Sequence, residues 1–428
     1  MSRDFCFCLI LYHGADKIRE FVMLKTIKNA EAHLLRFIVS LAALFILTGC
    51  QTIKTYLAIP DNHRVLFWSQ DKREGAFTQM EKHSEVAVIP ASSTVSPLPV
   101  GKPLVFDEGE MESFFETQHI AGLIVLEKGE IRYEKYARSL DREKRWSSFS
   151  LAKSMTSTLI GMAIKDGYID SVQSQLVQYI PELKGTVYDG VTIEHLITMT
   201  TGVGWSENYK ASSDVAQFII HKAPDGGDST ISYMSQLERV APPGQTFNYN
   251  TGEANLAGIL VKKATGRSIS EYLSEKIWKP YGMEADALWA LNEDGVEIGG
   301  CCVAARLRDF ARYGQFIMDG GTINGRSVVP VNWVEEATSV QTSFDERAGY
   351  GYLWWTFHSG IYGAEGIFGQ HMRFFPEQDI LIVTLSNWPS AVGSEEVRRN
   401  RKAMYSNIFV NIHLDKSNES ARYAVAAR

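Results

Sequence analysis

The sequence has few of the residues and motifs that mark several common protein classes. It contains five cysteines in 428 residues, and two of them, Cys301 and Cys302, are adjacent. Adjacent cysteines rarely bridge each other because their Cβ atoms diverge, so no disulfide framework is expected. The ten histidines form no His-Glu-x-x-His motif and no paired metal spacing, which argues against a zinc enzyme. A Gly-x-Ser-x-Gly nucleophile elbow is also absent from the sequence, which argues against an α/β-hydrolase triad.

Positive charge is not in excess either. The chain has 43 Lys and Arg against 50 Asp and Glu, for a formal net charge of −7. Nucleic-acid binding through a basic face is therefore not expected. The composition, 45% apolar and 22% charged, is that of an ordinary globular protein. A chain of this length can form one large domain or two closely packed ones.

Long hydrophobic runs are missing except for residues 37–47 (FIVSLAALFIL). This run is too short to span a bilayer comfortably, but it has the length of a signal-peptide core. It ends in Leu-Thr-Gly followed by Cys50, a pattern that looks like a bacterial lipobox. We expect residues 1–49 to be removed, with Met23 as an alternative start, and Cys50 to be lipidated. That predicts an exported protein anchored at the periplasmic face of a bacterial membrane, the outer membrane being favoured; an uncleaved anchor or a buried helix is the alternative.

The rest of the chain is predicted to have an α+β fold. Residues 120–127 and 131–136 predict one β-hairpin, and residues 371–375 and 380–386 predict a second one. Helical patterns lie between the hairpins, over residues 151–166, 194–199, 253–264, 269–278, 307–318 and 331–338. Strands at both ends favour an antiparallel β-sheet flanked by helices, with an inserted mainly helical subdomain.

The expected domain boundaries follow from this pattern. Residues 50–105 are interpreted as a tether and N-terminal segment, because the stretch before residue 100 is rich in Ser, Thr and Pro. The folded domain is expected over residues 106–413, and residues 414–428 are expected to form a frayed polar tail.

Two Ser-x-x-Lys motifs occur, at Ser150/Lys153 and at Ser69/Lys72, and a chain of this length should contain roughly one by chance. Lys72 lies among charged residues, where a lysine stays protonated and cannot act as a base. Ser150, in contrast, precedes an apolar helix that carries Lys153 one turn later on the same face. Free N–H groups and the helix dipole favour negative charge at Ser150, and burial would favour a neutral Lys153. The alternative is an ordinary N-cap serine with a lysine that reaches solvent.

Two further stretches complete the candidate site. Tyr249 follows a Pro-Pro-Gly turn and precedes a helix, so its phenol could pass protons in a cleft; the alternative is a core tyrosine. The glycine-rich residues 363–370 lead into a strand whose edge could lie close to a bound carbonyl. There the backbone N–H of Ile367 could form an oxyanion hole with that of Ser150. The alternative is a glycine-rich loop without chemistry.

These three stretches, in this order, resemble the serine β-lactamase and penicillin-binding-protein superfamily in its class C-like branch. In that branch Ser-x-x-Lys is followed about a hundred residues later by Tyr-x-Asn and then by a Lys/His-Thr-Gly strand. The chain looks more closely similar to 6-aminohexanoate-dimer hydrolases and their esterase-like relatives. The stretches that carry this resemblance are "SLAKS", "WSENY", "FNYNTGEANLAGIL", "GGCCVAARLRDFARYG" and "GIFGQHMRFFPEQDILIVTLSNWP".

The resemblance implies Ser150 as nucleophile, activated by Lys153 and Tyr249, with no metal or cofactor. It also implies a substrate-contacting Tyr209, with Thr251 and Gly366 beside the substrate. The sequence departs from the lactamase pattern at two places: Thr251 replaces Asn, and Gly366 with Ile367 replaces Lys-Thr-Gly.

These departures remove groups that lactamases and peptidases use around a substrate carboxylate. The resemblance therefore implies hydrolysis of esters or simple amides of small or peptide-like molecules. A cell-wall DD-peptidase or weak β-lactamase is one alternative, and a non-catalytic binder of peptidoglycan or acyl peptides is another. His371 is interpreted as a strand residue, and Cys301 and Cys302 are expected to pack against the floor of the site. The oligomeric state stays open.

Overall fold

The computed structural model of the chain describes residues 65–426, with side chains as far as Leu414 in the last helix. The predicted signal peptide, Cys50 and residues 51–64 lie outside the described residues. Within this part of the chain, no helix is long and apolar enough to cross a membrane.

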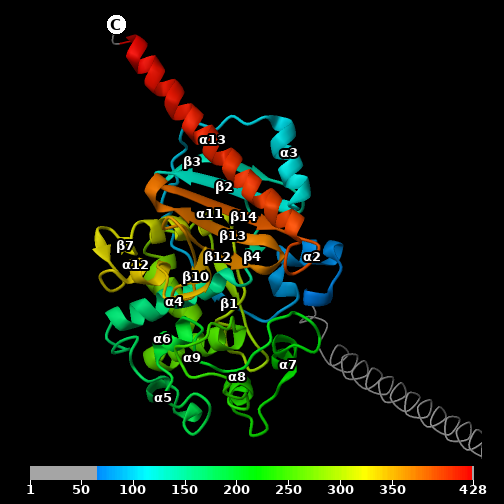
Figure 1. Cartoon of the computed structure of the whole chain (residues 1–428), viewed down its shortest axis with the longest axis vertical. Helices are drawn as coiled ribbons and strands as arrows, with labels where there is room; N and C mark the ends of the chain where they lie inside the picture. The colour runs from blue at the N-terminus through cyan, green and yellow to red at the C-terminus, as the bar shows by residue number, and fades with distance from the viewer. Residues whose placement is uncertain (1–64, 427–428) are drawn as a thin grey trace, which may run out of the picture. The chain divides into compact units, whose positions relative to one another are not determined.

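An eight-stranded antiparallel sheet organises the domain, in the order β3-β2-β14-β13-β12-β11-β10-β9 (Figure 1). Its strands are β2 (Ile120–Glu127), β3 (Glu130–Tyr136), β9 (Thr342–Asp345), β10 (Ala348–Tyr350), β11 (Trp355–Phe357), β12 (Tyr362–Gly366), β13 (Gln370–Phe375) and β14 (Ile380–Ser386). Strand β2 pairs with β14, from Glu127 opposite Ile380 to Ile120 opposite Ser386. Distant parts of the chain therefore close the sheet, and the two predicted hairpins, β2–β3 and β13–β14, are confirmed.

Two smaller sheets accompany the large one. A four-stranded sheet has the order β1-β5-β6-β4, and β7 and β8 form a two-stranded ribbon. These strands are β1 (Val86–Ile89), β4 (Trp146–Ser147), β5 (Ala287–Ala290), β6 (Val303–Ala305), β7 (Thr322–Ile323) and β8 (Arg326–Ser327).

Helices cover the sheets and form the inserted subdomain. They are α2 (Gln70–Phe77), α3 (Glu108–Thr117), α4 (Leu151–Lys165), α5 (Leu176–Tyr179), α6 (Ile193–Ile197), α7 (Asp214–Ile220), α8 (Ser229–Met234), α9 (Thr251–Thr265), α10 (Ile269–Leu273), α11 (Leu307–Met318), α12 (Trp333–Thr338) and α13 (Glu395–Ala426). Short helical turns are η2 (Met80–Lys82), η3 (Pro181–Leu183), η4 (Ser274–Trp278), η5 (Ile367–Gly369) and η6 (Pro376–Gln378). The predicted α+β class with a helical insertion is thus confirmed.

Both faces of the large sheet are buried. Successive strand residues point to opposite sides, so neighbouring residues of one strand enter different hydrophobic clusters. On β14, Ile380 and Ile382 pack with α3 and α13, whose apolar side chains include Met111 and Met404. The intervening Leu381 and Val383 join the main core, which includes α4, α9 and α11. Figure 1 shows α3 and α13 near β2, and helices α4, α6 and α9 grouped together away from them.

Capping decides where some helices begin. Helix α9 starts at Thr251, two residues before the predicted start, because the Asn250 side chain accepts a hydrogen bond from Glu253 N at 3.0 Å. The predicted helix over 269–278 divides into α10 and the π-helical turn η4, in which Lys279 N donates to Ser274 O at 2.9 Å. At the C-terminus, α13 continues to Ala426, where the sequence predicts a frayed tail after residue 413.

Residues 65–105 belong to the folded domain, which corrects the predicted tether. Strand β1 pairs along its whole length with β5. The buried Arg73 of α2 donates hydrogen bonds to Asn387 Oδ1 at 3.3 Å and to Trp388 O at 2.9 Å. Composition alone did not indicate this, because the partners that bury Arg73 lie more than three hundred residues away.

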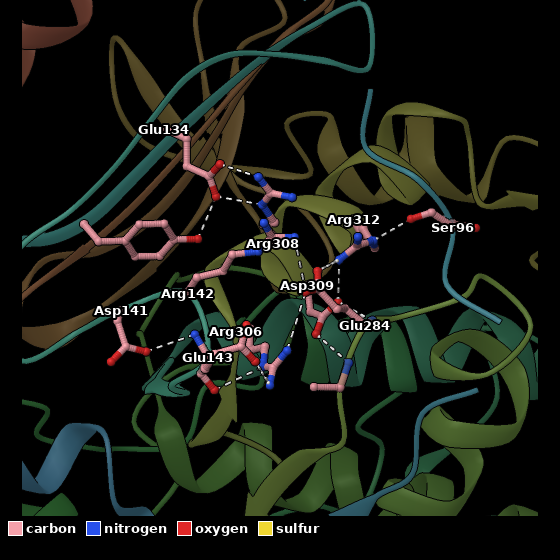
Figure 2. A network of polar contacts seen from close by, with 12 residues as sticks. Ser96, Glu134, Asp141, Arg142, Glu143, Glu284, Arg306, Arg308, Asp309 and Arg312 are labelled. Carbon is pink, nitrogen blue, oxygen red and sulfur yellow. Dashed lines mark hydrogen bonds and ion pairs between the residues drawn. The ribbon is translucent and has the colours of Figure 1, made fainter. Parts of the chain in front are cut away.

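A network of ion pairs holds three more segments together (Figure 2). Arg308 of α11 donates two hydrogen bonds to Glu134 of β3, at 2.8 and 2.6 Å. Arg312, one turn later, contacts Glu284 at 3.0 Å and donates to Ser96 O at 2.9 Å. Helix α11 thereby joins the edge of the large sheet to the N-terminal segment.

Candidate active site

Ser150 occupies the N-cap position of α4, but its side chain does not cap the helix. Instead, Ser150 Oγ accepts a hydrogen bond from Lys153 Nζ at 2.9 Å. The preceding Phe149 has a left-handed backbone with φ 46°, a conformation that costs free energy and is often found at functional sites. The turn directs the hydroxyl toward the lysine rather than toward the helix's own N–H groups.

Lys153 is buried, with 1% of its surface exposed. Besides Ser150 Oγ, its Nζ contacts Thr251 Oγ1 at 3.0 Å and Gly300 O at 2.8 Å. Burial lowers the pKa of Lys153 to about 8, and the negative charge of Glu207 opposes this shift. A neutral amine in this place can accept the proton of Ser150.

Tyr249 lies just before α9, near both Ser150 and Lys153. Its phenol interacts with the Ser150 side chain, which slightly opposes the rise of the phenol pKa, and its ring centroid lies 5.0 Å from Lys153 Nζ. Its ring stacks on Trp355 with 5.3 Å between centroids. Desolvation, and then the charge of Glu207, raise the pKa of Tyr249 far above its usual value. Tyr249 therefore stays protonated at neutral pH and can donate or relay a proton.

The end of β12 approaches the start of α4 closely. A Cβ atom at Gly366 would lie 2.4 Å from Ser148 O and 3.1 Å from Ser150 N, so only glycine fits there. Ile367, the next residue, lines the same cavity as Ser150. The structure thus brings together the two residues whose N–H groups were predicted to bind an oxyanion.

Thr251, Tyr209 and Glu207 form a second polar group beside Lys153. Thr251 Oγ1 accepts from Lys153 and donates to Glu207 Oε1, while Thr251 N donates to Glu207 Oε2 at 3.2 Å. Glu207 also interacts with the phenol of Tyr209, and its charge, after desolvation, raises the pKa of that phenol. A carboxylate therefore holds Thr251 in place and lies near Tyr209.

Glu207 is the functional candidate that sequence reasoning missed. It lies inside "WSENY", a stretch noted only for its tyrosine. A polar residue two positions from a predicted substrate-contacting tyrosine was the available signal. Its pairing with Thr251, 44 positions away, could not be read from the pattern.

A cavity of about 190 Å³ opens beside Ser150, and its walls include Tyr209, Thr251 and Ile367. Cys301 and Cys302 line it as expected, but the structure joins them in a disulfide, contrary to the sequence argument. His371 lies on β13, as predicted, and burial lowers its pKa well below the usual value. Among residues 65–426, no group of His, Cys, Asp and Glu is arranged to hold a metal ion.

A mixed helical and antiparallel-sheet fold with this arrangement defines a class: the hydrolases of the serine β-lactamase fold. The chain belongs to the beta-lactamase family, whose model, described as Beta-lactamase, matches residues 110–404. The resemblance stated from the sequence is therefore confirmed.

Individual relatives agree with that assignment. The chain is 28% identical over 298 residues to the 6-aminohexanoate-dimer hydrolase of Paenarthrobacter ureafaciens, covering 65% of this chain and 76% of the relative. It is 27% identical over 177 residues to Esterase EstB of Burkholderia gladioli, covering 37% and 44%. A solved Bacillus anthracis structure, provisionally assigned as a 6-aminohexanoate-dimer hydrolase, superposes with a TM-score of 0.71 at 24% identity, covering 80% and 94%. The family and these relatives point to a hydrolase, with both amidase-like and esterase-like members among them.

Proposed function

We propose that the protein hydrolyses ester or amide bonds of small acyl substrates through an acyl-enzyme on Ser150. The observation that carries this proposal is the buried Lys153, whose Nζ lies 2.9 Å from Ser150 Oγ and whose pKa is lowered to about 8. A solvent-exposed lysine would remain protonated at neutral pH and could not accept the serine proton.

The pKa values favour Lys153 over Tyr249 as the base. At pH 7 about a tenth of a group with a pKa near 8 is neutral, whereas a phenol with a raised pKa is almost wholly protonated. Lys153 takes the proton as Ser150 Oγ attacks the carbonyl carbon, and the N–H groups of Ser150 and Ile367 bind the developing oxyanion. Tyr249 relays a proton to the leaving group, and water then attacks the acyl-enzyme with Lys153 again as base.

Labelling of the nucleophile tests this proposal directly. The wild-type domain and Ser150→Ala are treated with a fluorophosphonate probe, digested and analysed by mass spectrometry. Hydrolysis of 4-nitrophenyl acetate and butyrate is measured on both. A single adduct on Ser150, with hydrolysis lost in the variant, is the expected result. A folded wild-type protein without adduct or turnover would exclude the mechanism and favour a non-catalytic binder of acyl peptides.

A second candidate, a cell-wall DD-peptidase or weak β-lactamase, is favoured by the relative Penicillin-binding protein 4* of Bacillus subtilis, which is 29% identical over 195 residues and of which the chain covers 40%. Against it stands the replacement of Lys-Thr-Gly by Gly366 and Ile367. Stable acylation by a fluorescent penicillin with slow turnover would favour this candidate. Rapid ester hydrolysis by a protein that the penicillin does not label would exclude it.

We also propose that Cys50 carries a lipid that anchors the protein at the periplasmic face of a bacterial membrane. The outer membrane is favoured over the inner one. The lipobox-like Leu-Thr-Gly-Cys after an apolar run supports this. Cys50→Ser should release the protein from the membrane fraction and abolish incorporation of a labelled fatty acid.

A further inference from the structure

Part of the wall of the cavity beside Ser150 comes from residues 65–84, which precede the stretch 110–404 that the family model matches. Residues before, within and just after α2 and η2 line it. Residues of α7 and of the β5–β6 connection also line it, and Met80 of η2 packs in one cluster with Leu288 and Ala290 of β5. The apolar side chains that these segments contribute include Leu66, Ala76, Phe77, Met80, Val215 and Phe218.

Phe77 of α2 connects this wall to the reacting groups. Its ring lies 5.0 Å from that of Phe149 and 5.8 Å from that of Phe368. Phe149 directly precedes Ser150, and Phe368 directly follows Ile367. One side chain of α2 therefore packs against both residues that flank the proposed oxyanion hole.

Helix α2 is fixed firmly enough to form a binding wall. Arg73 is 3% exposed, and its guanidinium lies 4.1 Å from the ring centroid of Phe368 while donating to Trp68 O and Trp388 O. Asn387 Nδ2 in turn donates to Gln70 O at 2.9 Å. These contacts bind the helix to the loop after β14.

The charged side chains that line the cavity are acidic. They are Glu207, Glu293 and Asp294, and none of the described residues that line it is a lysine or an arginine. Glu293 pairs with the exposed Lys222 outside the wall. Two histidines, His83 and His221, also line it, and burial lowers the pKa of the His221 imidazole. A carboxylate placed among apolar side chains and like charges would be strongly disfavoured.

We infer that this cavity is an acyl-chain site, completed by residues 65–84, that selects uncharged esters or amides with an unbranched apolar acyl group longer than butyryl. The inference rests on the proposed function and names its substrate class. Each methylene that leaves water should raise kcat/KM by about fourfold, up to the length of the cavity.

A series of 4-nitrophenyl esters tests the length and the charge together. We expect kcat/KM to rise at least tenfold from butyrate to octanoate. The suberate monoester, which ends in a carboxylate, should fall at least tenfold below octanoate. The 8-aminooctanoate ester should also fall below it, because the apolar side chains of the cavity would remove water from its ammonium group and Glu293 already pairs with Lys222. A flat or falling series from acetate to octanoate, or an amino ester better than octanoate, would overturn the inference.

Two neighbouring positions on α2 provide a matched pair of variants. Ala76 is buried in the cavity wall, whereas Gly75 is exposed and a Cβ there would meet nothing within 4 Å. Ala76→Phe should lower the octanoate-to-acetate ratio of kcat/KM at least tenfold, while Gly75→Phe should leave that ratio unchanged. An unchanged ratio in a folded Ala76→Phe protein would contradict an acyl site at this wall.

Adduct formation separates the two possible failures. Without a fluorophosphonate adduct on Ser150 and without acetate hydrolysis, the proposed function itself fails. With adduct and acetate hydrolysis but no gain with chain length, only the acyl-chain inference fails. If Ala76→Phe does not fold, Met80→Ala provides the second test. The smaller side chain enlarges the cavity, so the acyl length with the highest kcat/KM should increase. An unchanged preferred length would contradict the inference.

Discussion

The chain contains the motif Ser-x-x-Lys in two regions, and its lysine is exposed in one region and buried in the other. Ser69 caps α2, and its Oγ accepts a hydrogen bond from Lys72 N at 3.3 Å. Lys72 is exposed, with its ammonium 4.1 Å from the ring centroid of Trp68. Ser150 also stands at a helix start, but its hydroxyl accepts from the Nζ of a lysine that is 1% exposed.

The difference shows that the motif only sets the spacing. In both regions the serine and the lysine lie one helical turn apart. Only around Lys153 does the tertiary structure remove water and supply Thr251 Oγ1 and Gly300 O as partners. Desolvation, and not the sequence Ser-x-x-Lys, lowers the lysine pKa toward neutrality.

Replacing each lysine in turn by methionine should give the largest difference in kcat/KM between the two motifs. Lys153→Met removes the proposed base, and we expect kcat/KM for 4-nitrophenyl butyrate to fall by about 10³-fold or more. Lys72→Met should leave it within about threefold. Equal effects of the two substitutions, in proteins with native circular dichroism, would contradict the assignment of Lys153.

Tyr249→Phe should have the next largest effect. It removes a hydroxyl that interacts with the Ser150 side chain but keeps the ring that stacks on Trp355. We expect kcat to fall by about 10²-fold, since the variant keeps the nucleophile and the base but loses the relay. The loss should be smaller for 4-nitrophenyl esters than for anilides, because nitrophenolate leaves without a proton. Identical losses with both leaving groups would argue against a relay.

The pH dependence sharpens the comparison between a buried and an exposed lysine. The active form is the neutral amine, so the rate should fall about tenfold per pH unit below the pKa of Lys153, which is about 8. Above that pKa the rate should level off. A kcat/KM profile that reaches its plateau near pH 8 would support Lys153 as the base. A profile that still rises beyond pH 10 would indicate the phenol of Tyr249 as the base.

Ser69→Ala should produce the smallest effect. It removes the N-cap of α2 and should lower the free energy of unfolding by about 0.5–1 kcal/mol. Turnover of 4-nitrophenyl acetate should stay unchanged, because Ser69 touches none of the reacting groups. Urea denaturation of both proteins measures the first quantity. A loss of turnover comparable to that of Ser150→Ala would mean that the two motifs had been assigned the wrong roles.

Much of the fold followed from local patterns, and particular elements show why. The hairpin β2–β3 and the helices α4 and α11 were predicted nearly to the residue, because each has a clear period and a turn or glycine at its end. The N-terminal segment was misread because its burial depends on Asn387 and Trp388, at the far end of the chain. The Cys301–Cys302 disulfide contradicted a general rule about neighbouring cysteines.

The sequence by itself determined the local elements and the one-turn spacing of Ser150 and Lys153, because helical periodicity acts over a few residues. It also carried the order of the three stretches that mark the family. Only the tertiary structure decided that Lys153 is buried beside Ser150 and has a lowered pKa, since its partners Thr251 and Gly300 lie 98 and 147 positions away. The same holds for Glu207 beside Thr251 and for α2 as a wall of the cavity. Desolvation and charge depend on what the folded chain brings within a few ångströms, and no local pattern contains that information.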